Sequence, residues 1–252
     1  MTTSTTKNKI IRLLRITLPV ILWLLVYEAA ALIIGNNYFL PRLYLVFSSL
    51  FEIVTTPVFF KVCFFTLLRV VTALAIGTLA GIILGILSAK FAIIYHILSP
   101  LMTAIKATPV ASLIIVLWIM MSGDALAIVI ALFMVLPIIW QSTYNAFDTI
   151  DKGLQEVAEI FELSEKYKFE VLYLPNIKKY LVPSIITSVG LAWKSEIATE
   201  IIAYTRNSIG QLINDGKYNL DTPTVFAWTL IVIVFSIVFE SLIRLLLRRS
   251  KA

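Results

Sequence analysis

The sequence predicts an all-α membrane protein in which a single chain crosses the bilayer six times. Of its 252 residues, 60% are hydrophobic and 14% are charged, whereas soluble domains are about 45–50% apolar and about 25% charged. Six apolar stretches have close to the roughly 20 residues that a membrane-spanning helix requires. They are Ile16–Ile34, Thr66–Ala89, Ile97–Met121, Ala125–Tyr144, Ile177–Tyr204 and Pro223–Leu246.

The chain before the second apolar stretch contains a polar tail and an interrupted segment. Residues 1–9 are polar and rich in Thr, which predicts a disordered cytoplasmic tail, and residues 10–252 are expected to form one transmembrane domain. Two prolines interrupt Asn36–Lys61, so we expect an external segment with a short interfacial helix around Leu45–Val54. Glu28 lies inside the first stretch, where a charge is costly, and is expected to have a structural partner or to lie at an interface.

The positions of glycine and proline predict how the second, third and fourth apolar stretches pack and bend. Gly77, Gly81 and Gly85 recur every four residues in the second stretch, a spacing that lets two helix backbones approach closely in lipid. Pro137 predicts a kink in the fourth stretch. The third stretch is expected to cross the membrane with Pro109 inside it.

The distribution of Lys and Arg predicts the orientation. With the N-terminus placed inside, the inside segments carry 14 of the 21 Lys and Arg residues, and the outside segments carry Arg42, Lys61, Arg206 and Lys217. Positive charge is enriched on the cytoplasmic side of membrane proteins. We therefore expect both termini to be cytoplasmic in a multi-pass protein of the cell membrane.

Between the fourth and fifth stretches lies the one long polar segment of the chain, Asp148–Pro175. Four of its apolar residues are spaced at i, i+3, i+4 and i+7, as on one face of a helix; they are Leu154, Val157, Ala158 and Phe161. Asp148 and Asp151 are suited to cap the start of such a helix. We expect an amphipathic helix at Asp151–Leu163 that either presses into a partner outside the lipid or lies on the bilayer surface.

The same segment resembles the EAA loop of the membrane subunits of ABC importers. That loop has Glu-x-Ala, a Gly four residues later and then hydrophobic-x-Leu-Pro; here it reads Glu156-Val157-Ala158, Glu162 in the Gly position, and Leu172-Tyr173-Leu174-Pro175. Because Gly at that position allows the chain to turn, we expect the turn to be made elsewhere, at Ser164. The resemblance implies that the loop docks on a cytoplasmic ATPase through Leu154, Glu156, Val157, Ala158, Phe161, Glu162, Leu174 and Pro175.

Further motifs resemble the nitrate/sulfonate/taurine-type branch of these permeases, over roughly Leu40 to Arg248. They include the sequences KATPVA at Lys106–Ala111, GLAWKS at Gly190–Ser195 and SIGQLI at Ser208–Ile213. The resemblance implies a type I ABC importer permease fold, with residues 148–175 as the coupling loop. It also implies a function: a translocation path for a small solute, such as a sulfonate, nitrate or a related anion.

The partners implied by the resemblance are two ATP-binding subunits, an extracytoplasmic substrate-binding protein and a second permease copy. A homodimer is expected, with a heterodimer left open. ATP and Mg would belong to the partner ATPase, and no nucleic acid is expected. Two alternatives remain: a permease of the same type for a thiamine-precursor-like or riboflavin-like heterocycle, and an ATPase-independent channel or secondary transporter. The second of these more often shows repeated halves, and the sequence shows no internal repeat.

Charged residues at membrane depth mark either a solute path or ion pairs between helices. The candidates for the path are Lys106, Trp193, Lys194, Glu196 and Glu200. Glu196 and Glu200 share a helix face because they are four residues apart, whereas Lys194 cannot lie on the same stripe. The alternative is a structural ion pair, for example of Arg69 or Lys106 with one of the two glutamates, and packing is the favoured role of Trp193.

The remaining composition argues against an enzyme. A single Cys63 and a single His96 leave no cysteine cluster or histidine set for a metal. Gly210–Lys217 has five residues between its glycines, where a phosphate-binding loop needs four, and Tyr218 follows the Lys instead of Ser or Thr. We expect no catalytic, cofactor-binding or metal-binding residue and no nucleotide site in this chain.

Overall fold

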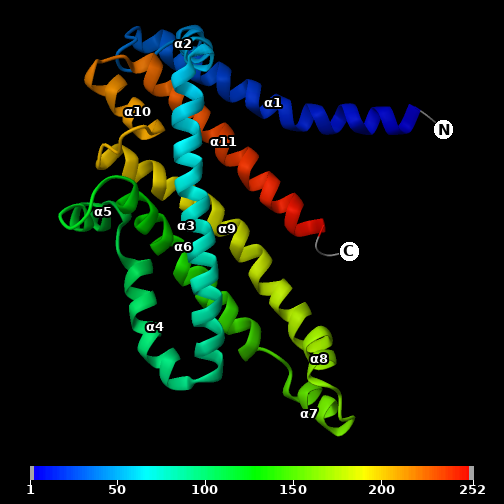
Figure 1. Cartoon of the computed structure of the whole chain (residues 1–252). Coiled ribbons are helices and arrows are strands. Elements are labelled where there is room, and N and C mark those ends of the chain that lie inside the picture. The colour runs from blue at the N-terminus through cyan, green and yellow to red at the C-terminus, as the bar shows by residue number, and fades with distance from the viewer. Residues whose placement is uncertain (1–2, 250–252) are drawn as a thin grey trace.

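The computed structural model describes residues 3–249 and confirms the all-α prediction. The described part of the chain is built from helices and contains no strand (Figure 1). The helices are α1 Thr3–Ile34, α2 Leu43–Thr55, α3 Pro57–Lys90, α4 Ala92–Ala107, α5 Val110–Trp118, α6 Gly123–Asp148, α7 Lys152–Ile160, α8 Glu165–Lys168, the π-helical turn η1 Phe169–Tyr173, α9 Leu174–Ile202, α10 Ile209–Tyr218 and α11 Thr222–Arg249.

Four helices among the described residues are individually long and apolar enough to cross a membrane, and a bent pair makes a possible fifth. The four lie in α1, α3, α6 and α11. Helix α9 is not among them because its 29 residues include five charged side chains, Lys178, Lys179, Lys194, Glu196 and Glu200. At 1.5 Å per residue α9 is nevertheless about 44 Å long, which exceeds the hydrocarbon core of a bilayer.

The third predicted span is not one helix. Instead of a continuous Ile97–Met121, α4 and α5 meet at a bend of 101°. The cause is Pro109, because the residue before a proline is pushed out of the helical region, and Thr108 is extended with φ −75° and ψ 129°. This segment is therefore a broken span or a re-entrant loop.

The core is formed by α3, α6 and α9, which lie side by side (Figure 1). The glycines of α3 face α6 as predicted from their spacing. A Cβ added to Gly77 would lie 3.0 Å from the Val135 side chain, and one added to Gly81 would lie 2.8 Å from Ile139. On Gly85 it would lie 2.5 Å from Cβ of Thr143. The two backbones approach so closely that no side chain fits between them at these points.

The first helix joins the body at a corner with α2. Arg42 pairs with Glu28 at 2.9 Å, and the other Glu28 oxygen accepts the Leu43 amide at the start of α2. Glu28 is thus a structural partner, one of the two roles expected for it. The predicted disordered tail is wrong for residues 3–9, which are helical and continue α1; they contain neither Pro nor Gly to interrupt it.

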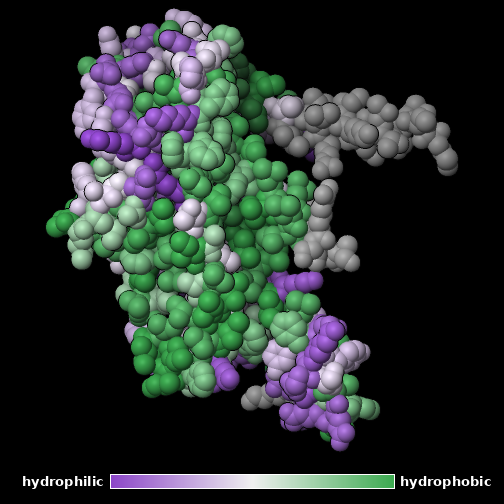
Figure 2. Space-filling model, viewed as in Figure 1, coloured by the Kyte–Doolittle hydropathy of each residue, from purple (hydrophilic) through white to green (hydrophobic). Residues whose placement is uncertain are grey.

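Figure 2 shows an apolar middle between two hydrophilic ends. Hydrophilic residues gather around α10 and α2 at one end and around α7 and α8 at the other, while the helices between them expose large apolar side chains. This is the distribution expected of a protein whose middle faces lipid. The two hydrophilic ends are the places where sites for water-soluble partners are to be sought.

Candidate functional site

The amphipathic helix forms at one end of the molecule as α7. Asp151 caps it as predicted, with a carboxylate oxygen that accepts the Gly153 amide at 2.7 Å. Leu154, Val157 and Phe161 are exposed, as a docking surface requires. Exposed apolar side chains on a short helix that projects from the body (Figure 1) are well placed to contact another protein.

Two residues of α7 differ from the predicted apolar face. Ala158 was expected to share it, but only 2% of its surface is exposed. Ile160 was not expected on the face, yet 77% of it is exposed. The helix is therefore turned so that Ala158 points into the protein and Ile160 joins the exposed group. The i+3 spacing of Ile160 from Val157 was the signal in the sequence that could have identified it.

The turn after α7 is made at Glu162 itself, and the expectation that Ser164 makes it is wrong. Glu162 has φ +49°, in the left-handed region that usually requires Gly. Its amide donates to the Glu159 carbonyl at 2.9 Å, and the Leu163 amide donates to the Ala158 carbonyl at 3.0 Å. This pair of bonds is a Schellman motif, so Glu162 takes the conformation of the missing Gly. Ser164 instead caps α8 by accepting the Tyr167 amide.

The loop that contains α7 runs between two long helices, α6 and α9. Asn176, next to Pro175 at the start of α9, donates to the Ala146 carbonyl at 2.6 Å and to the Thr149 hydroxyl at 3.2 Å, at the end of α6. Leu174 and Pro175 form the first turn of α9, directly after the π-helical turn η1. Glu156 is exposed on α7. The Asn176 bonds therefore hold the start of α9 against the end of α6.

The five intramembrane candidates do not form one group. Lys106, at the end of α4, and Lys194, on α9, are both exposed, whereas Glu196, Glu200 and Trp193 are buried. Trp193 stacks on Phe235 with ring centroids 6.3 Å apart, which agrees with a packing role. The separation of Lys194 from the two glutamates follows from helix geometry, as expected.

Glu200 takes part in a buried ion pair, the alternative considered for it. Arg69 donates to Glu200 at 2.8 Å and to Asp124 at 2.7 Å, so one guanidinium joins α3, α6 and α9. Glu200 also accepts the Thr66 hydroxyl at 2.7 Å and the Gly210 amide at 3.0 Å. A buried pair is tolerated when further hydrogen bonds satisfy its remaining atoms, and here they do.

Sequence reasoning missed Asp124, Thr66 and Gly210 as partners of this pair. An acidic residue at the start of a span, such as Asp124, is a natural partner for an Arg at similar depth, and this was the available signal. Gly210 is required because a Cβ there would collide with Glu200 and lie 2.7 Å from the Ile201 amide nitrogen. Glu196 is different: both of its carboxylate oxygens are buried and have no hydrogen-bond partner among the described residues.

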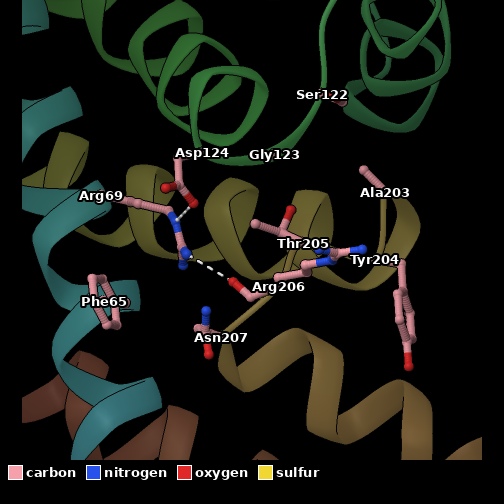
Figure 3. A pocket seen from close by; sticks show the side chains of 10 residues that line it. All are labelled: Phe65, Arg69, Ser122, Gly123, Asp124, Ala203, Tyr204, Thr205, Arg206 and Asn207. Atoms are coloured by element: carbon pink, nitrogen blue, oxygen red, sulfur yellow. Dashed lines mark hydrogen bonds and ion pairs between the residues drawn. The ribbon is translucent and has the colours of Figure 1, made fainter.

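Beside the ion pair lies a cavity of about 450 Å³ (Figure 3). It opens between the start of α6 and the loop from α9 to α10. Figure 3 shows Arg69 at one side of the lining, bonded to Asp124 and to the Arg206 carbonyl. Tyr204 lies at its edge and donates to Asp215; this hydrogen bond is the main cause that raises the pKa of the Tyr204 phenol.

Comparison with known proteins identifies the family. The family described as binding-protein-dependent transport system inner membrane component matches residues 77–252. The chain is also 25% identical over 183 residues to a protein of Bacillus subtilis (strain 168) described as putative aliphatic sulfonates transport permease protein SsuC. That match covers 72% of this chain and 66% of the relative, slightly less than two thirds of the relative's length. The chain belongs to the family of binding-protein-dependent transport system inner membrane components.

Proposed function

We propose that this chain is the membrane-spanning subunit of an ATP-driven ABC importer. It would form the path for a small solute that an extracytoplasmic binding protein delivers. The observation that carries the proposal is α7, a short helix with exposed apolar residues at a hydrophilic end of the molecule. In this proposal the chain crosses the bilayer six times, with the bent pair α4–α5 as one crossing and α9 as another, and both termini lie in the cytoplasm.

The geometry of the coupling loop supports a mechanism for energy transfer. Two ATP-binding subunits, with ATP and Mg bound, would each receive one α7 in a groove, one from each of two permease copies. Closure of the ATPases would move α7, which the chain joins to α9 through α8 and η1. The bonds of Asn176 would then carry a shift of α9 to α6. The π-helical turn η1 lies where α9 begins. Such turns are frequent at functional sites. In this mechanism α9 would bend at η1 when α7 moves.

The proposed solute is a small anion, such as a sulfonate or nitrate. The name of the Bacillus relative supports a sulfonate, as do the sequence motifs of this branch. A thiamine-precursor-like or riboflavin-like heterocycle is the alternative within the same mechanism. An ATPase-independent channel or secondary transporter is the alternative of a different class, and in it the exposed apolar residues of α7 would lie on the bilayer surface.

The first test is co-purification. A tagged chain is solubilised gently from its native membrane, and co-purifying proteins are identified by mass spectrometry. In parallel, Val157, on α7, and Phe161, directly after it, are both changed to Ser; both side chains are exposed. The control changes Tyr218 and Leu220, which are also exposed and lie at the opposite end, to Ser. Each double variant replaces two exposed large apolar side chains, but at opposite ends of the molecule.

The proposal predicts that a subunit with a phosphate-binding loop co-purifies with the wild type and with the control, and is lost or strongly reduced in the α7 variant. Ala158 is not used because it is buried, and a change there would report on folding. If no ATPase accompanies the wild type, or if both double variants retain it equally, docking through α7 is wrong.

A further inference from the structure

We propose that the cavity between the start of α6 and the α9–α10 loop binds the anionic head group of the solute, and that this group is an oxyanion such as an alkyl sulfonate. This inference rests on the proposed transport function and adds a binding site to it. The cavity differs from the sequence candidates Lys106 and Lys194, which do not line it. Its polar lining comes from Arg69, Ser122, Asp124, Thr205, Arg206 and Asn207.

The start of α6 offers unused hydrogen-bond donors to the cavity. Its N-cap residue, Ser122, makes no side-chain capping bond, so the first amides of this 26-residue helix carry no side-chain cap. The neighbouring α10 is the opposite case: its first amides are taken by Thr66, Glu200 and the Ser208 hydroxyl. An uncapped helix start carries partial positive charge and attracts anions. A small anion in the cavity would reach the α6 start and not that of α10.

A second observation, independent of the helix, points to a ligand. Thr205 lines the cavity and is only 1% exposed, and its hydroxyl has no hydrogen-bond partner among the described residues. A buried hydroxyl without a partner is costly and calls for an explanation. A ligand oxygen that accepts from this hydroxyl would remove the cost. Figure 3 shows Thr205 between Arg206 and the Gly123–Asp124 backbone, in the middle of the lining.

The balance of charge in the lining favours an anion. The lining carries two positive side chains, Arg69 and Arg206, and one negative side chain, Asp124. Glu200, which also pairs with Arg69, does not line the cavity. Arg206 also lines the cavity, and its side chain forms no ion pair with the described residues. Three of the five N–H groups of Arg69 are used in hydrogen bonds that fix the guanidinium in place. Arg206 would supply the positive charge that attracts the anion, and Arg69 would form a fixed positive wall of the cavity.

The volume of the cavity also suits a small organic anion. About 450 Å³ is within the range of small-molecule sites, about 300–1,000 Å³. Phe65 and Ala203 add apolar surface to the polar lining. A short alkyl chain attached to a sulfonate would find both kinds of contact.

The test measures charge preference at a single cysteine. Cys63, which is buried, is replaced by Ala, and Ser122, which is exposed and makes no capping bond, is replaced by Cys. The purified complex is treated with 2-sulfonatoethyl methanethiosulfonate, itself an alkyl sulfonate, or with the trimethylammonium reagent of the same length. Each labelling rate is divided by the rate with free 2-mercaptoethanol. Ethanesulfonate is the competing probe.

The inference predicts that the normalised anionic rate exceeds the cationic rate by roughly tenfold, as a charge-assisted contact implies, and that ethanesulfonate slows the labelling. Arg206→Gln is expected to abolish the preference. Thr205→Val keeps the shape and is expected to weaken protection by ethanesulfonate about fivefold, the effect of one lost hydrogen bond. Lys217→Gln, at the same end but outside the lining, is the control and should leave both readouts unchanged.

Equal rates for the two reagents, or an anionic preference that survives Arg206→Gln, would overturn the inference, as would a lack of protection by ethanesulfonate. The failure of the site is separable from that of the proposed function, because co-purification of the ATPase is scored on the same preparations. A bound ATPase without charge preference refutes the site alone. A charge preference with protection, but without any ATPase, supports the anion site and refutes ATP-driven transport.

Discussion

Substitution of Gly85 by Ala should loosen the contact between α3 and α6 at its tightest point. The new Cβ would lie 2.5 Å from Cβ of Thr143 and 2.9 Å from the Trp140 carbonyl oxygen. Carbon atoms normally approach to about 3.5–4.0 Å, so the helices must separate by about 1 Å. Overpacking of this kind costs about 1–3 kcal/mol, and Ala recovers up to about 1 kcal/mol as the better helix former. We expect a net loss of about 1–2 kcal/mol.

The chain provides both a graded series and a control. A Cβ added to Gly77 would lie 3.0 Å from the Val135 side chain and no closer to any other atom, so Gly77→Ala should cost less than Gly85→Ala. Gly190, on α9, has nothing within 4 Å of an added Cβ, and Gly190→Ala should leave stability unchanged or raise it. The free energy of unfolding is measured by SDS titration in mixed micelles, with the thermal midpoint as a second ranking. Equal stability of all three variants would refute the packing argument, and so would a loss at Gly190 as large as at Gly85.

Four further changes test the ion pair and the coupling loop. Glu200→Gln should lower the unfolding free energy in the SDS titration by about 3 kcal/mol, because it leaves the buried Arg69 without one of its two negative partners. Glu196→Gln removes a carboxylate that has no hydrogen-bond partner among the described residues, so it should be neutral or stabilising in the same titration. Glu162→Gly should leave α7 formed and raise the thermal midpoint slightly, because relief of about 1–2 kcal/mol of left-handed strain exceeds the added chain entropy; a lower midpoint would contradict this. Asn176→Ala should retain the co-purifying ATPase but reduce ATP-driven uptake of the solute into proteoliposomes. Unchanged uptake would show that Asn176 takes no part in coupling.

The features best predicted from the sequence were those encoded in local spacing. Gly77, Gly81 and Gly85 recur at i+4, so their close packing followed from helix geometry and from the demands of packing in lipid. The capping of α7 by Asp151 also needed only neighbouring residues. The break of the third span at Thr108 was missed because the span was predicted from the hydrophobicity of the whole stretch, which one proline hardly changes. The steric clash between a proline ring and the residue before it is nevertheless enough to end the helix.

Features that depend on the relative depth of helices could not be predicted. A pair of Arg69 with one of the two glutamates was an alternative from the sequence, but the sequence does not say which glutamate faces Arg69 or that α6 presents Asp124 at the same level. The turn at Glu162 was missed for another reason. A left-handed non-glycine residue is disfavoured locally, and the bonds of the surrounding Schellman motif hold it there. Similarly, the rotation of α7 that buries Ala158 depends on its attachment to the rest of the molecule.

The most direct test of the central claim is a cross-link from α7 to a partner. A photo-reactive benzoyl-phenylalanine is placed at Ile160, which is 77% exposed on α7, or at Leu220, which is 70% exposed at the opposite end. After irradiation in native membranes, the cross-linked partner is identified by mass spectrometry. The account predicts that position 160 captures a subunit with a phosphate-binding loop and that position 220 does not. Cross-linking of position 160 to lipid alone, or capture of the ATPase only from position 220, would contradict it.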